Sequence, residues 1–482
     1  MQAVLDQFNS VVNSLKQHTE NRTRIQKWLI AGGGLLVLVY LGKLLIRGRE
    51  RRVSPLPKGG KPYQSVKSKD NKEENEYDVV VAGGGVSGST CAFFLAKKGL
   101  QVLVLEKNSE CNTNTVDDVL TMSAQKIISE MGVLKACQGN AINAVSINGH
   151  KAKASFKSVH DTTGSVYKNS MGVKASQVRS AVVESAKKQS NVTYLNNQNV
   201  LKTRWSPSDK LWTVDCEQSS YRARAIVLAD GGQSELATKL RLVKTPTDGT
   251  RSHLLIKANQ LSKAPSSDQV IAYHRAVSPG YCSIIKYSDG DVGLSTVVVP
   301  GNPRVSATNS EELHSMCKST IGTELLGILP NDLEAPTVVP LRTGGVERTF
   351  KDHLLVVGGA AGLMDPLTGS SITYSLQSAK IAAEVIHEGF TCGDLTDRVT
   401  RRYQEKWRLQ FNQAFQSSLR IRGLLAKYPT LVEAIITLAA KKGDSFSSEL
   451  LRVFLGAKDR SWFLRPDVTF FFLIELARLS LF

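Results

Sequence analysis

Short apolar runs and longer amphipathic stretches alternate along most of the chain after residue 76. The run 77–82 predicts a buried strand, the segment that starts near Gly88 predicts a helix, and 102–105 predicts a second strand. Strand, helix and strand in this order are typical of a βαβ unit, in which the two strands are parallel. The pattern therefore predicts an α/β fold class with a parallel sheet at its centre.

The type of predicted element changes twice along the later part of the chain. Further strands are predicted at 192–195, 212–214 and 224–228, and helices at 117–134, 176–188 and 372–388. Residues 250–345 instead alternate in short β-like runs, which is the pattern of an antiparallel sheet that covers a substrate pocket. We therefore predict a body over 77–400 that contains an antiparallel β-sheet substrate domain at 250–345. A helical C-terminal region follows at 401–482.

Three glycines follow the first predicted strand, at Gly83, Gly85 and Gly88, and Glu106 closes the second strand. The first glycine allows a tight turn, the second leaves room for a pyrophosphate beside the backbone, and the third lets the helix pack closely on the strand. An acid after the second strand accepts hydrogen bonds from a ribose, which favours FAD or NAD over a 2′-phosphorylated dinucleotide. We therefore predict a Rossmann-type dinucleotide-binding domain. Its candidate cofactor-binding residues are Gly83, Gly85, Val86, Ser87, Gly88, Glu106 and Lys107.

Two later segments repeat the combination of strand and glycine. The strand 226–230 ends in Asp230 and Gly231, and the strand 354–357 runs into a glycine-rich loop and then into the long helix. A strand that delivers glycines to a helix N-terminus places backbone N–H groups against an anionic or electron-accepting ring system. The candidate cofactor-binding residues of these segments are Asp230, Gly231, Gly359, Gly362, Pro366, Gly369, Ser370 and Ser371.

Residues 28–46 form an apolar stretch that only Lys43 interrupts, and its length approaches the roughly 20 residues that span the hydrocarbon of a bilayer. A cleaved signal peptide is the alternative, but four arginines between residues 47 and 52 follow directly, with no small-residue cleavage site. We predict a retained N-terminal transmembrane helix at 28–46. It separates an N-terminal segment at 1–27 from a basic, flexible linker at 47–76.

The formal net charge is +18, and most of the excess lies at the two ends of the chain. More Lys and Arg residues follow the apolar stretch than precede it, so the body is expected on the cytosolic side. A basic surface is typical of proteins that bind nucleic acid or anionic membranes, and the sequence contains no nucleic-acid-binding motif. We therefore predict a single-pass membrane protein of the endoplasmic reticulum or another intracellular membrane, with no nucleic acid as partner.

The seven cysteines are scattered and never spaced as C-x-x-C, which favours reduced thiols over a disulfide framework. His, Cys and acidic residues do not recur at metal-ligand spacing, so we predict no metal. The region 250–345 also carries no obvious charged clamp for a substrate, which favours an apolar substrate. The oligomeric state does not follow from the sequence.

Together, the three glycine-bearing segments resemble the FAD stretches of flavoproteins built like para-hydroxybenzoate hydroxylase, and within them the geranylgeranyl reductase family. The resemblance covers roughly residues 77–430. Features more specific to the reductases are Pro340-Leu341 before Gly344-Gly345, the phrase Gly369-Ser370-Ser371-Ile372 followed by Ala382-Ala383-Glu384, and Tyr403-Gln404-Glu405-Lys406-Trp407 before Phe411 and Arg420. The resemblance implies FAD as the cofactor, NAD(P)H as the electron donor and a lipid or isoprenoid as the substrate.

The chain departs from the family pattern at two places. Members usually carry Gly-Asp where this chain has Gly358-Gly359, and that carboxylate normally hydrogen-bonds the ribityl chain of FAD. Its loss is expected to cost about 1.5 to 3 kcal/mol of binding free energy, which a site with many other contacts can survive. Of the family's substrate signature only Tyr281 remains, and we predict this residue as the candidate catalytic proton donor.

Reduction of an isoprenoid adds a hydride to one alkene carbon and a proton to the other, so the site must supply an acid and exclude water. Two other functions remain open. A monooxygenase similar to squalene epoxidase also joins a membrane anchor to this fold and has a Pro-Leu-Thr-Gly loop like 366–369. A membrane-tethered flavin-binding scaffold without catalysis is the third candidate, because two functional motifs are degraded.

Overall fold

The computed structural model describes residues 52–454 with internal gaps, and single positions after residue 454. The gaps are 58–59, 66–74, 110–117, 150, 158–169, 245–246, 248, 262–264, 266, 274–276, 278–279, 299–335 and 429, and the later positions are Trp462, Arg465, Val468, Phe471, Phe472, Ile474, Glu475 and Arg478. The chain divides into two compact units, Arg51–Arg460 and a second unit made of Met1–Glu50 and Ser461–Phe482. The predicted anchor at 28–46 lies outside the described residues.

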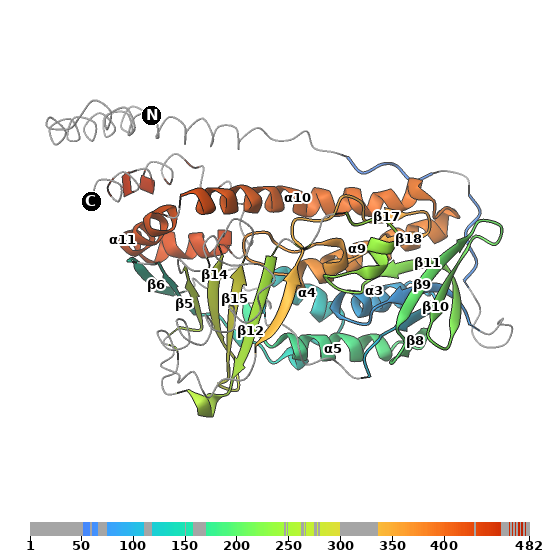
Figure 1. The fold of residues 1–482 in the computed structure, drawn as a ribbon, viewed down its shortest axis with the longest axis horizontal. Coiled ribbons are helices and arrows are strands. Elements are labelled where there is room, and N and C mark those ends of the chain that lie inside the picture. The colour runs from blue at the N-terminus through green and yellow to red at the C-terminus, as the bar shows by residue number, and fades with distance from the viewer. Residues whose placement is uncertain are drawn as a thin grey trace. The chain divides into compact units, whose positions relative to one another are not determined.

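An eight-stranded sheet forms one end of the larger unit, in the order β17-β18-β11-β1-β2-β8, with β10 and β9 added beside β11 (Figure 1). Its strands are β1 (Glu76–Ala82), β2 (Val102–Leu105), β8 (Val192–Leu195), β9 (Val200–Ser206), β10 (Leu211–Cys216), β11 (Ser220–Leu228), β17 (Phe350–Lys351) and β18 (Leu354–Val356). The strands β18, β11, β1, β2 and β8 are parallel to one another. All of β2 and the last five of the seven residues of β1 are buried, which is why 79–82 and 102–105 are continuous apolar runs in the sequence.

Three long helices complete this Rossmann-type domain: α3 (Val86–Lys97), α5 (Ala175–Lys187) and α9 (Ile372–Cys392). Helix α3 packs against both α5 and α9. It is buried on most sides, with Ser89, Thr90 and Cys91 all inaccessible to solvent. The helices predicted at 176–188 and 372–388 therefore agree with α5 and α9 to within a few residues at their ends.

A seven-stranded sheet, named the substrate sheet after the role predicted for it, has the strand order β16-β12-β15-β14-β13-β5-β6. Its strands are β5 (Ala144–Asn148), β6 (Lys153–Lys157), β12 (Gly249–Ile256), β13 (Gln269–Ala272), β14 (Tyr281–Lys286), β15 (Val292–Val298) and β16 (Thr337–Leu341). The neighbours pair antiparallel, except β13 and β5, which are parallel. The described strands between residues 249 and 341 thus pair antiparallel with one another, and the hairpin of β5 and β6 joins this sheet from a segment that lies about a hundred residues earlier.

The helix predicted at 117–134 is wrong in its first part. A strand, β3 (Asp118–Leu120), comes first, and the helix α4 (Met122–Glu130) follows. Thr121 separates the two because its side-chain oxygen accepts a hydrogen bond from Ala124 N (3.4 Å), which is an N-cap. β3 pairs with the distant strand β7 (Met171–Val173), which also pairs with β4 (Asn140–Ala141), and the short helix η1 (Leu134–Cys137) lies before β4.

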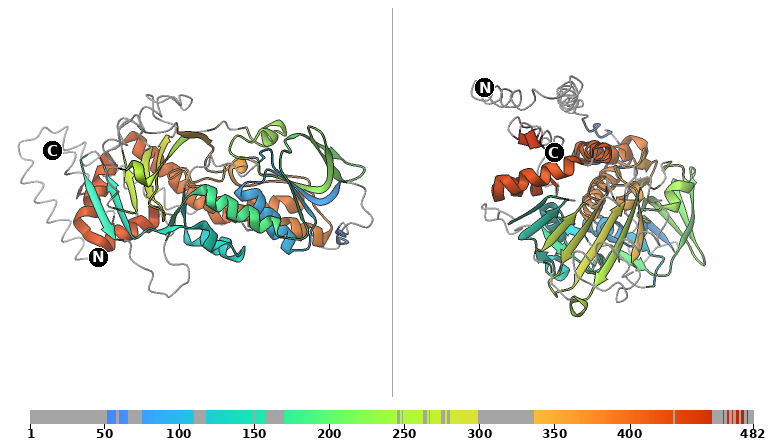
Figure 2. Two further views of the ribbon diagram at one scale, coloured as in Figure 1. Left: turned by 90° about the horizontal axis from the view of Figure 1, so that it is seen from below. Right: turned by 60° about the vertical axis from the view of Figure 1, so that its left-hand side comes forward.

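Two helices form the C-terminal region, α10 (Asp397–Lys427) and α11 (Thr430–Phe454). Helix α10 runs along the length of the larger unit (Figure 1), and α11 packs against β6 at the edge of the substrate sheet (Figure 2). Gly443 interrupts α11 with a φ of 78°. Among the described helices, none by itself is long and apolar enough to cross a membrane; α10 and most of α11 reach these limits only as a pair bent by 107°.

The segment expected to be a flexible linker lies against the body in its described part. Ser54 N and Ser54 Oγ donate to the two carboxylate oxygens of Glu405 on α10, both at 2.8 Å. Tyr63 N donates to Phe390 O on α9 at 2.8 Å, and the two aromatic rings meet edge to face at 5.6 Å. Residues 52–57 and 60–65 therefore form a strap along α9 and α10, in which polar groups of the predicted linker bind to the body.

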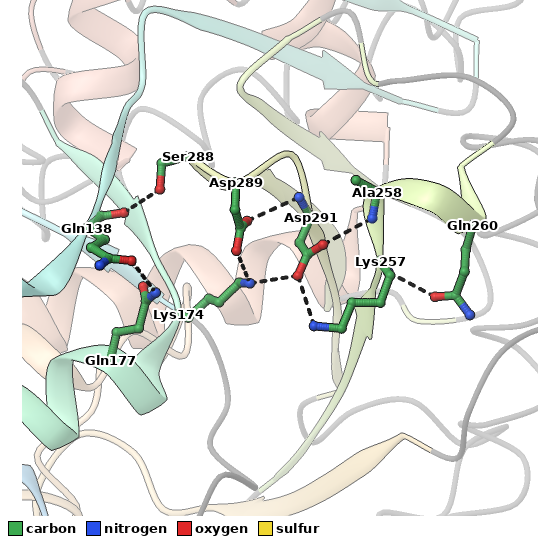
Figure 3. A network of polar contacts seen from close by, with 9 residues as sticks. All are labelled: Gln138, Lys174, Gln177, Lys257, Ala258, Gln260, Ser288, Asp289 and Asp291. Atoms are coloured by element: carbon green, nitrogen blue, oxygen red, sulfur yellow. Dashed lines mark hydrogen bonds and ion pairs between the residues drawn. The ribbon is translucent and has the colours of Figure 1, made fainter.

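A polar network joins the substrate sheet to the dinucleotide-binding domain (Figure 3). Lys174, the N-cap residue of α5, binds Asp289 at 2.5 Å and Asp291 at 2.7 Å, both in the turn between β14 and β15. Asp291 also accepts from Lys257 Nζ at 3.1 Å and from Ala258 N at 3.0 Å. These bonds hold the turn between β14 and β15 at the N-terminus of α5.

Candidate cofactor and substrate site

The three glycines of the first motif are required for different reasons. A β-carbon at Gly83, whose φ is +104°, would lie 2.4 Å from Ala229 O, and one at Gly88 would lie 1.9 Å from Gly83 O. Both positions are therefore closed by the protein itself. A β-carbon at Gly85 would meet no atom within 4 Å, although Gly85 is the N-cap residue of α3. This open space at a helix N-terminus fits a pyrophosphate.

Glu106 lies where the ribose acid is predicted, directly after β2, and is buried. Its Oε2 accepts from Gly84 N (2.9 Å) and from Arg179 Nη2 (3.3 Å), and its Oε1 accepts from Asn108 N (3.0 Å) and Asn108 Nδ2 (2.7 Å). The bonds from Gly84 N and Asn108 N orient the carboxylate of Glu106 directly after β2, where the acid that binds a ribose is expected.

A cavity of about 230 Å³ lies beside Glu106. Its other lining residues are Ser109, Arg179, Ser180, Val183, Glu184, Lys187, Tyr194 and Asn196. The Nε of Arg179 is buried and has no hydrogen-bond partner among the described residues. The size and the donors fit the adenosine end of FAD. Tyr194 is the last residue but one of β8, and Asn196 directly follows the strand, at the carboxyl edge of the sheet where α/β proteins bind ligands. The sequence around Arg179 has no comparable pattern, so the sequence alone does not identify this residue as part of the site.

The second motif places Asp230 and Gly231 directly after β11. The carboxylate of Asp230 accepts from Ser234 Oγ (2.7 Å) and from Leu236 N (3.2 Å) in the first turn of α6 (Glu235–Lys239). Burial raises the pKa of this carboxyl group, and the two hydrogen bonds oppose that shift. A β-carbon at Gly231 (φ +84°) would meet nothing within 4 Å, so this backbone also borders open space.

The third motif packs onto the other two. Gly358 and Gly359 begin the short helix η5 (Gly358–Ala361) after β18. A β-carbon at Gly358 would lie 1.9 Å from Ser87 Oγ of the first motif, and one at Gly359 would lie 3.3 Å from Gly232 N, next to the second motif. Three segments that are far apart in the sequence thus meet at one place. This convergence is the geometry expected of a single FAD site.

The loop 365–371 is held rigidly before α9. The buried carboxylate of Asp365 accepts from Leu367 N and Thr368 N, both at 2.9 Å, and from Ser418 Oγ on α10 at 2.9 Å. Gly369 has a φ of +62°. No side-chain hydrogen bond caps the first turn of α9 at Ser371. If FAD is bound, this loop and the N-terminus of α9 would support its flavin ring through backbone groups.

The remaining predicted residues lie on these elements. Val86 and Ser87 begin α3, Gly362 is the left-handed C-cap of η5, Pro366 and Ser370 lie in the loop before α9, and Lys107 is exposed after β2. Among the described residues, no group of three His, Cys, Asp or Glu side chains could hold a metal ion.

Tyr281 lies at the start of β14 and is buried beside the loop 365–371. Its hydroxyl donates to Thr368 O, and its ring lies 6.1 Å from that of Tyr273. The hydroxyl thus positions the loop in this structure, and the proton-donor role stays a prediction. Against the expectation of no charged clamp, Arg251 on β12 is buried on the same side of the sheet and its Nη1 lies 3.4 Å from Gly369 O.

Known proteins that are similar to this chain support an FAD-binding site. A family model described as "FAD binding domain" matches residues 76–410. Conditioned medium factor receptor 1 of Dictyostelium discoideum is 31% identical over 434 residues, which cover 86% of this chain and 83% of that protein. Digeranylgeranylglycerophospholipid reductase 2 of Methanothermobacter thermautotrophicus is 28% identical over 366 residues, which cover 73% of this chain and 88% of that protein.

Solved structures share the fold. A geranylgeranyl bacteriochlorophyll reductase-like protein of Thermoplasma acidophilum superimposes with a TM-score of 0.65 at 19% identity, covering 77% of this chain and 93% of that chain. A p-nitrophenol 4-monooxygenase of Pseudomonas putida gives 0.62 at 17% identity, covering 80% and 99%. The predicted resemblance to the geranylgeranyl reductases is confirmed. The chain belongs to the family of FAD-dependent oxidoreductases that carry this FAD binding domain.

Proposed function

We propose that this chain is a membrane-anchored, NAD(P)H-dependent reductase of double bonds in isoprenoids or other lipids. The observation that carries the proposal is the similarity to reductases of digeranylgeranylglycerophospholipids over most of their length. The convergence of the three glycine-bearing segments supports FAD as the cofactor. FAD supplies hydride transfer when it is bound.

The chain's own residues have distinct parts in this proposal. The N-terminus of α3 at Gly85 faces the pyrophosphate, Glu106 and Arg179 hold the ribose, and the loop 365–371 supports the flavin ring. The substrate sheet covers the loop through Tyr281 and excludes water from the reacting atoms.

The predicted anchor is the basis for the location that we propose for the body. A transmembrane segment at 28–46 would confine the body to the cytosolic surface of an intracellular membrane, where an insoluble lipid substrate is concentrated. The basic residues near both ends of the chain would face anionic lipid head groups. The partners in this proposal are therefore the membrane and a lipid or isoprenoid substrate.

The test is anaerobic turnover. Purified full-length protein in detergent or vesicles is incubated with NADPH or NADH and geranylgeranyl lipids without oxygen, and the lipids are analysed by mass spectrometry. We expect products heavier by pairs of hydrogen atoms. Protein without FAD serves as the control, and an unchanged lipid with a fully reduced flavin would contradict the proposal.

A monooxygenase is the second candidate, favoured by solved structures with the same fold such as the p-nitrophenol 4-monooxygenase. The same incubation in air separates the two. Products heavier by oxygen, with oxygen consumed in proportion to product, would establish the monooxygenase.

A flavin-binding scaffold is the third candidate, favoured by the name of the Dictyostelium relative, which describes a receptor, and by Gly359 in place of the family's carboxylate. Protein that binds FAD but whose flavin neither NADH nor NADPH reduces would establish it. A visible spectrum of the purified protein decides this point.

A further inference from the structure

Ser54 attaches the first part of the strap to α10. Its Oγ and its backbone N donate to the two carboxylate oxygens of Glu405, both at 2.8 Å, and Arg402 Nη1 donates to Ser54 O. None of the residues 52–57 is buried, and Leu56 is 39% exposed. Polar contacts therefore hold this part of the strap on the body, and no buried apolar side chain of residues 52–57 adds to them.

The sequence around Ser54 has the charge pattern of a substrate for a basophilic protein kinase. Arg51 and Arg52 lie three and two residues before the serine, and no other serine of the chain has arginines at both positions. Kinases of this class bind such arginines through acidic groups and take up the substrate in an extended conformation. Pro55 favours an extended backbone at Ser54, and residues 52–57 contain no helix or strand.

We propose that Ser54 is a phosphorylation site and that its phosphorylation releases residues 52–57 from α10. The co-reactants are ATP and a basophilic serine kinase. Ser54 Oγ attacks the γ-phosphorus of ATP, and the new O–P bond forms as the bond to the bridging oxygen of ADP breaks. The hydroxyl proton passes to the base of the kinase, and ADP and phosphoserine are the products.

Phosphorylation turns the contact with Glu405 from attraction into repulsion. The Ser54 hydroxyl donates a hydrogen bond to this carboxylate, whereas a phosphoserine carries a charge of about −1.5 to −2 at pH 7. The two cations near Glu405 in α10 are already paired, since Arg402 Nε and Lys406 Nζ bind Glu388 at 3.1 and 2.7 Å. The phosphate therefore meets a like charge, and release of the strap is the favourable response.

Release of Ser54 lengthens the tether between the body and the predicted anchor. The strap stays attached further along, at Gly60 and Tyr63 against the end of α9. The first attachment thus moves by six residues, from Ser54 to Gly60, which adds at most about 22 Å of reach. If residues 28–46 span a bilayer, the body can then move further from its surface. This consequence rests on the proposed anchor, whereas the phosphorylation and the release do not.

Phosphorylation of the purified protein tests the site. Full-length protein in detergent is incubated with magnesium, ATP and the catalytic subunit of cAMP-dependent protein kinase, which prefers arginines at these two positions. Mass spectrometry then locates the phosphate. We expect it on Ser54, with an initial rate at least tenfold lower in Arg52→Gln, because Arg52 is exposed and available to the kinase.

Ser65 is the internal control in this experiment. Its hydroxyl also donates to a carboxylate, that of Asp78, but no arginine lies within three residues before it. We therefore expect at least tenfold less phosphate on Ser65 than on Ser54. No phosphate on Ser54, or equal rates in the wild type and Arg52→Gln, would overturn the site.

Hydrogen exchange tests the release. We expect the Ser54 amide to exchange at least tenfold faster in the phosphorylated protein, because it loses its bond to Glu405. Glu405→Ala removes the same acceptor without a phosphate and should give a similar increase, whereas Glu130→Ala, which removes a glutamate bound to Lys380 on α9, should leave the exchange unchanged. Exchange in the buried strand β1 is followed in every sample, so a folding defect is recognised.

Unchanged or slower exchange of the Ser54 amide after phosphorylation would overturn the release. It would mean that the phosphate is held in place on α10. The result does not depend on the reductase function or on the anchor, because neither a lipid nor a membrane is present in the experiment.

Discussion

At the scale of single residues, a glycine can be required because the protein leaves no room for a side chain or because a ligand needs the room. Gly83 and Gly88 belong to the first kind, since a β-carbon at either would collide with backbone oxygens. Gly85 belongs to the second, because a β-carbon there would meet nothing within 4 Å. A substitution at Gly85 is therefore expected to impair cofactor binding without impairing folding.

We expect Gly85→Val to fold normally and to lose FAD, because the valine side chain would occupy the space of the pyrophosphate. The measurement is the flavin released from denatured, pure protein, with circular dichroism as the check on folding. Gly423→Val on α10 is the control, since a β-carbon at Gly423 also meets nothing within 4 Å but lies in a different helix. Unchanged flavin content in Gly85→Val would contradict the assigned site.

Gly359 is the position where the chain departs from its family. A β-carbon there would lie 3.3 Å from Gly232 N and 3.5 Å from Gly231 C, a close fit that a small movement of the backbone relieves. We expect Gly359→Asp to strengthen FAD binding by about 1.5 kcal/mol, or about tenfold, by restoring a charge-assisted hydrogen bond. Titration calorimetry with FAD measures this. Gly359→Asn, which has the same shape without the charge, should gain less; weaker binding in Gly359→Asp would mean that the loop has been rebuilt around glycine.

At the scale of elements, the contact between α5 and the β14–β15 turn depends on Lys174. Burial tends to lower the pKa of Lys174, but its bonds to Asp289 and Asp291 outweigh burial and raise it. Burial likewise tends to raise the pKa of Asp291, but the bonds from Lys174, Ala258 N and Lys257 hold it below its usual value. The network thus couples two parts of the fold through charge.

We expect Lys174→Met to destabilise the protein by about 1 to 3 kcal/mol at pH 7, because it leaves the largely buried carboxylate of Asp291 with fewer donors. Asp291 has a lowered pKa in the folded state, so its contribution is present above the unfolded value near 4 and is lost as the pH falls through the folded value. The difference between variant and wild type should therefore shrink in strong acid.

Chemical denaturation at several pH values measures this difference. Lys239→Met is the control, because its ion pair with Glu235 is exposed and spaced i,i+4 within α6, and should change stability by less than about 0.5 kcal/mol. A loss in Lys174→Met that does not depend on pH would show that Lys174 acts through packing rather than charge.

At the scale of the whole molecule, the strap formed by residues 52–57 and 60–65 binds the end of the basic segment to α9 and α10. Ser54 is bound to Glu405, so few residues separate the predicted anchor from the body. If residues 28–46 span a bilayer, the body must stay close to its surface, because an extended residue covers at most about 3.6 Å.

We expect added protease to digest the body in sealed microsomes and to leave a protected fragment of roughly the first 27 residues, because the basic residues after the anchor favour the cytosolic side. Western blots with tags at both ends measure this. Microsomes opened with detergent are the control, in which both ends should be digested. Protection of the C-terminal tag in sealed microsomes would place the body in the lumen.

Part of this architecture follows from local sequence. The strands β1 and β2, the helices α5 and α9 and the glycine turn were predictable, because hydrophobic periodicity and glycine spacing report conformations set by neighbouring residues. The start of α4 was not, because residues 118–120 are a strand only through pairing with β7, some fifty residues later. The same holds for β5 and β6, which complete a sheet whose other strands begin at Gly249.

The sequence by itself determined the cofactor class and the order of the elements that hold the cofactor. It could not show that Ser54 and Tyr63 bind to α10 and α9, that Arg179 reaches Glu106, or that Arg251 and His253 share a buried face beside Gly369. Each of these contacts joins residues that are far apart in the chain, so no local pattern encodes it. The tertiary structure decided them, because burial and hydrogen bonding between distant segments depend on how the two sheets and the C-terminal helices pack.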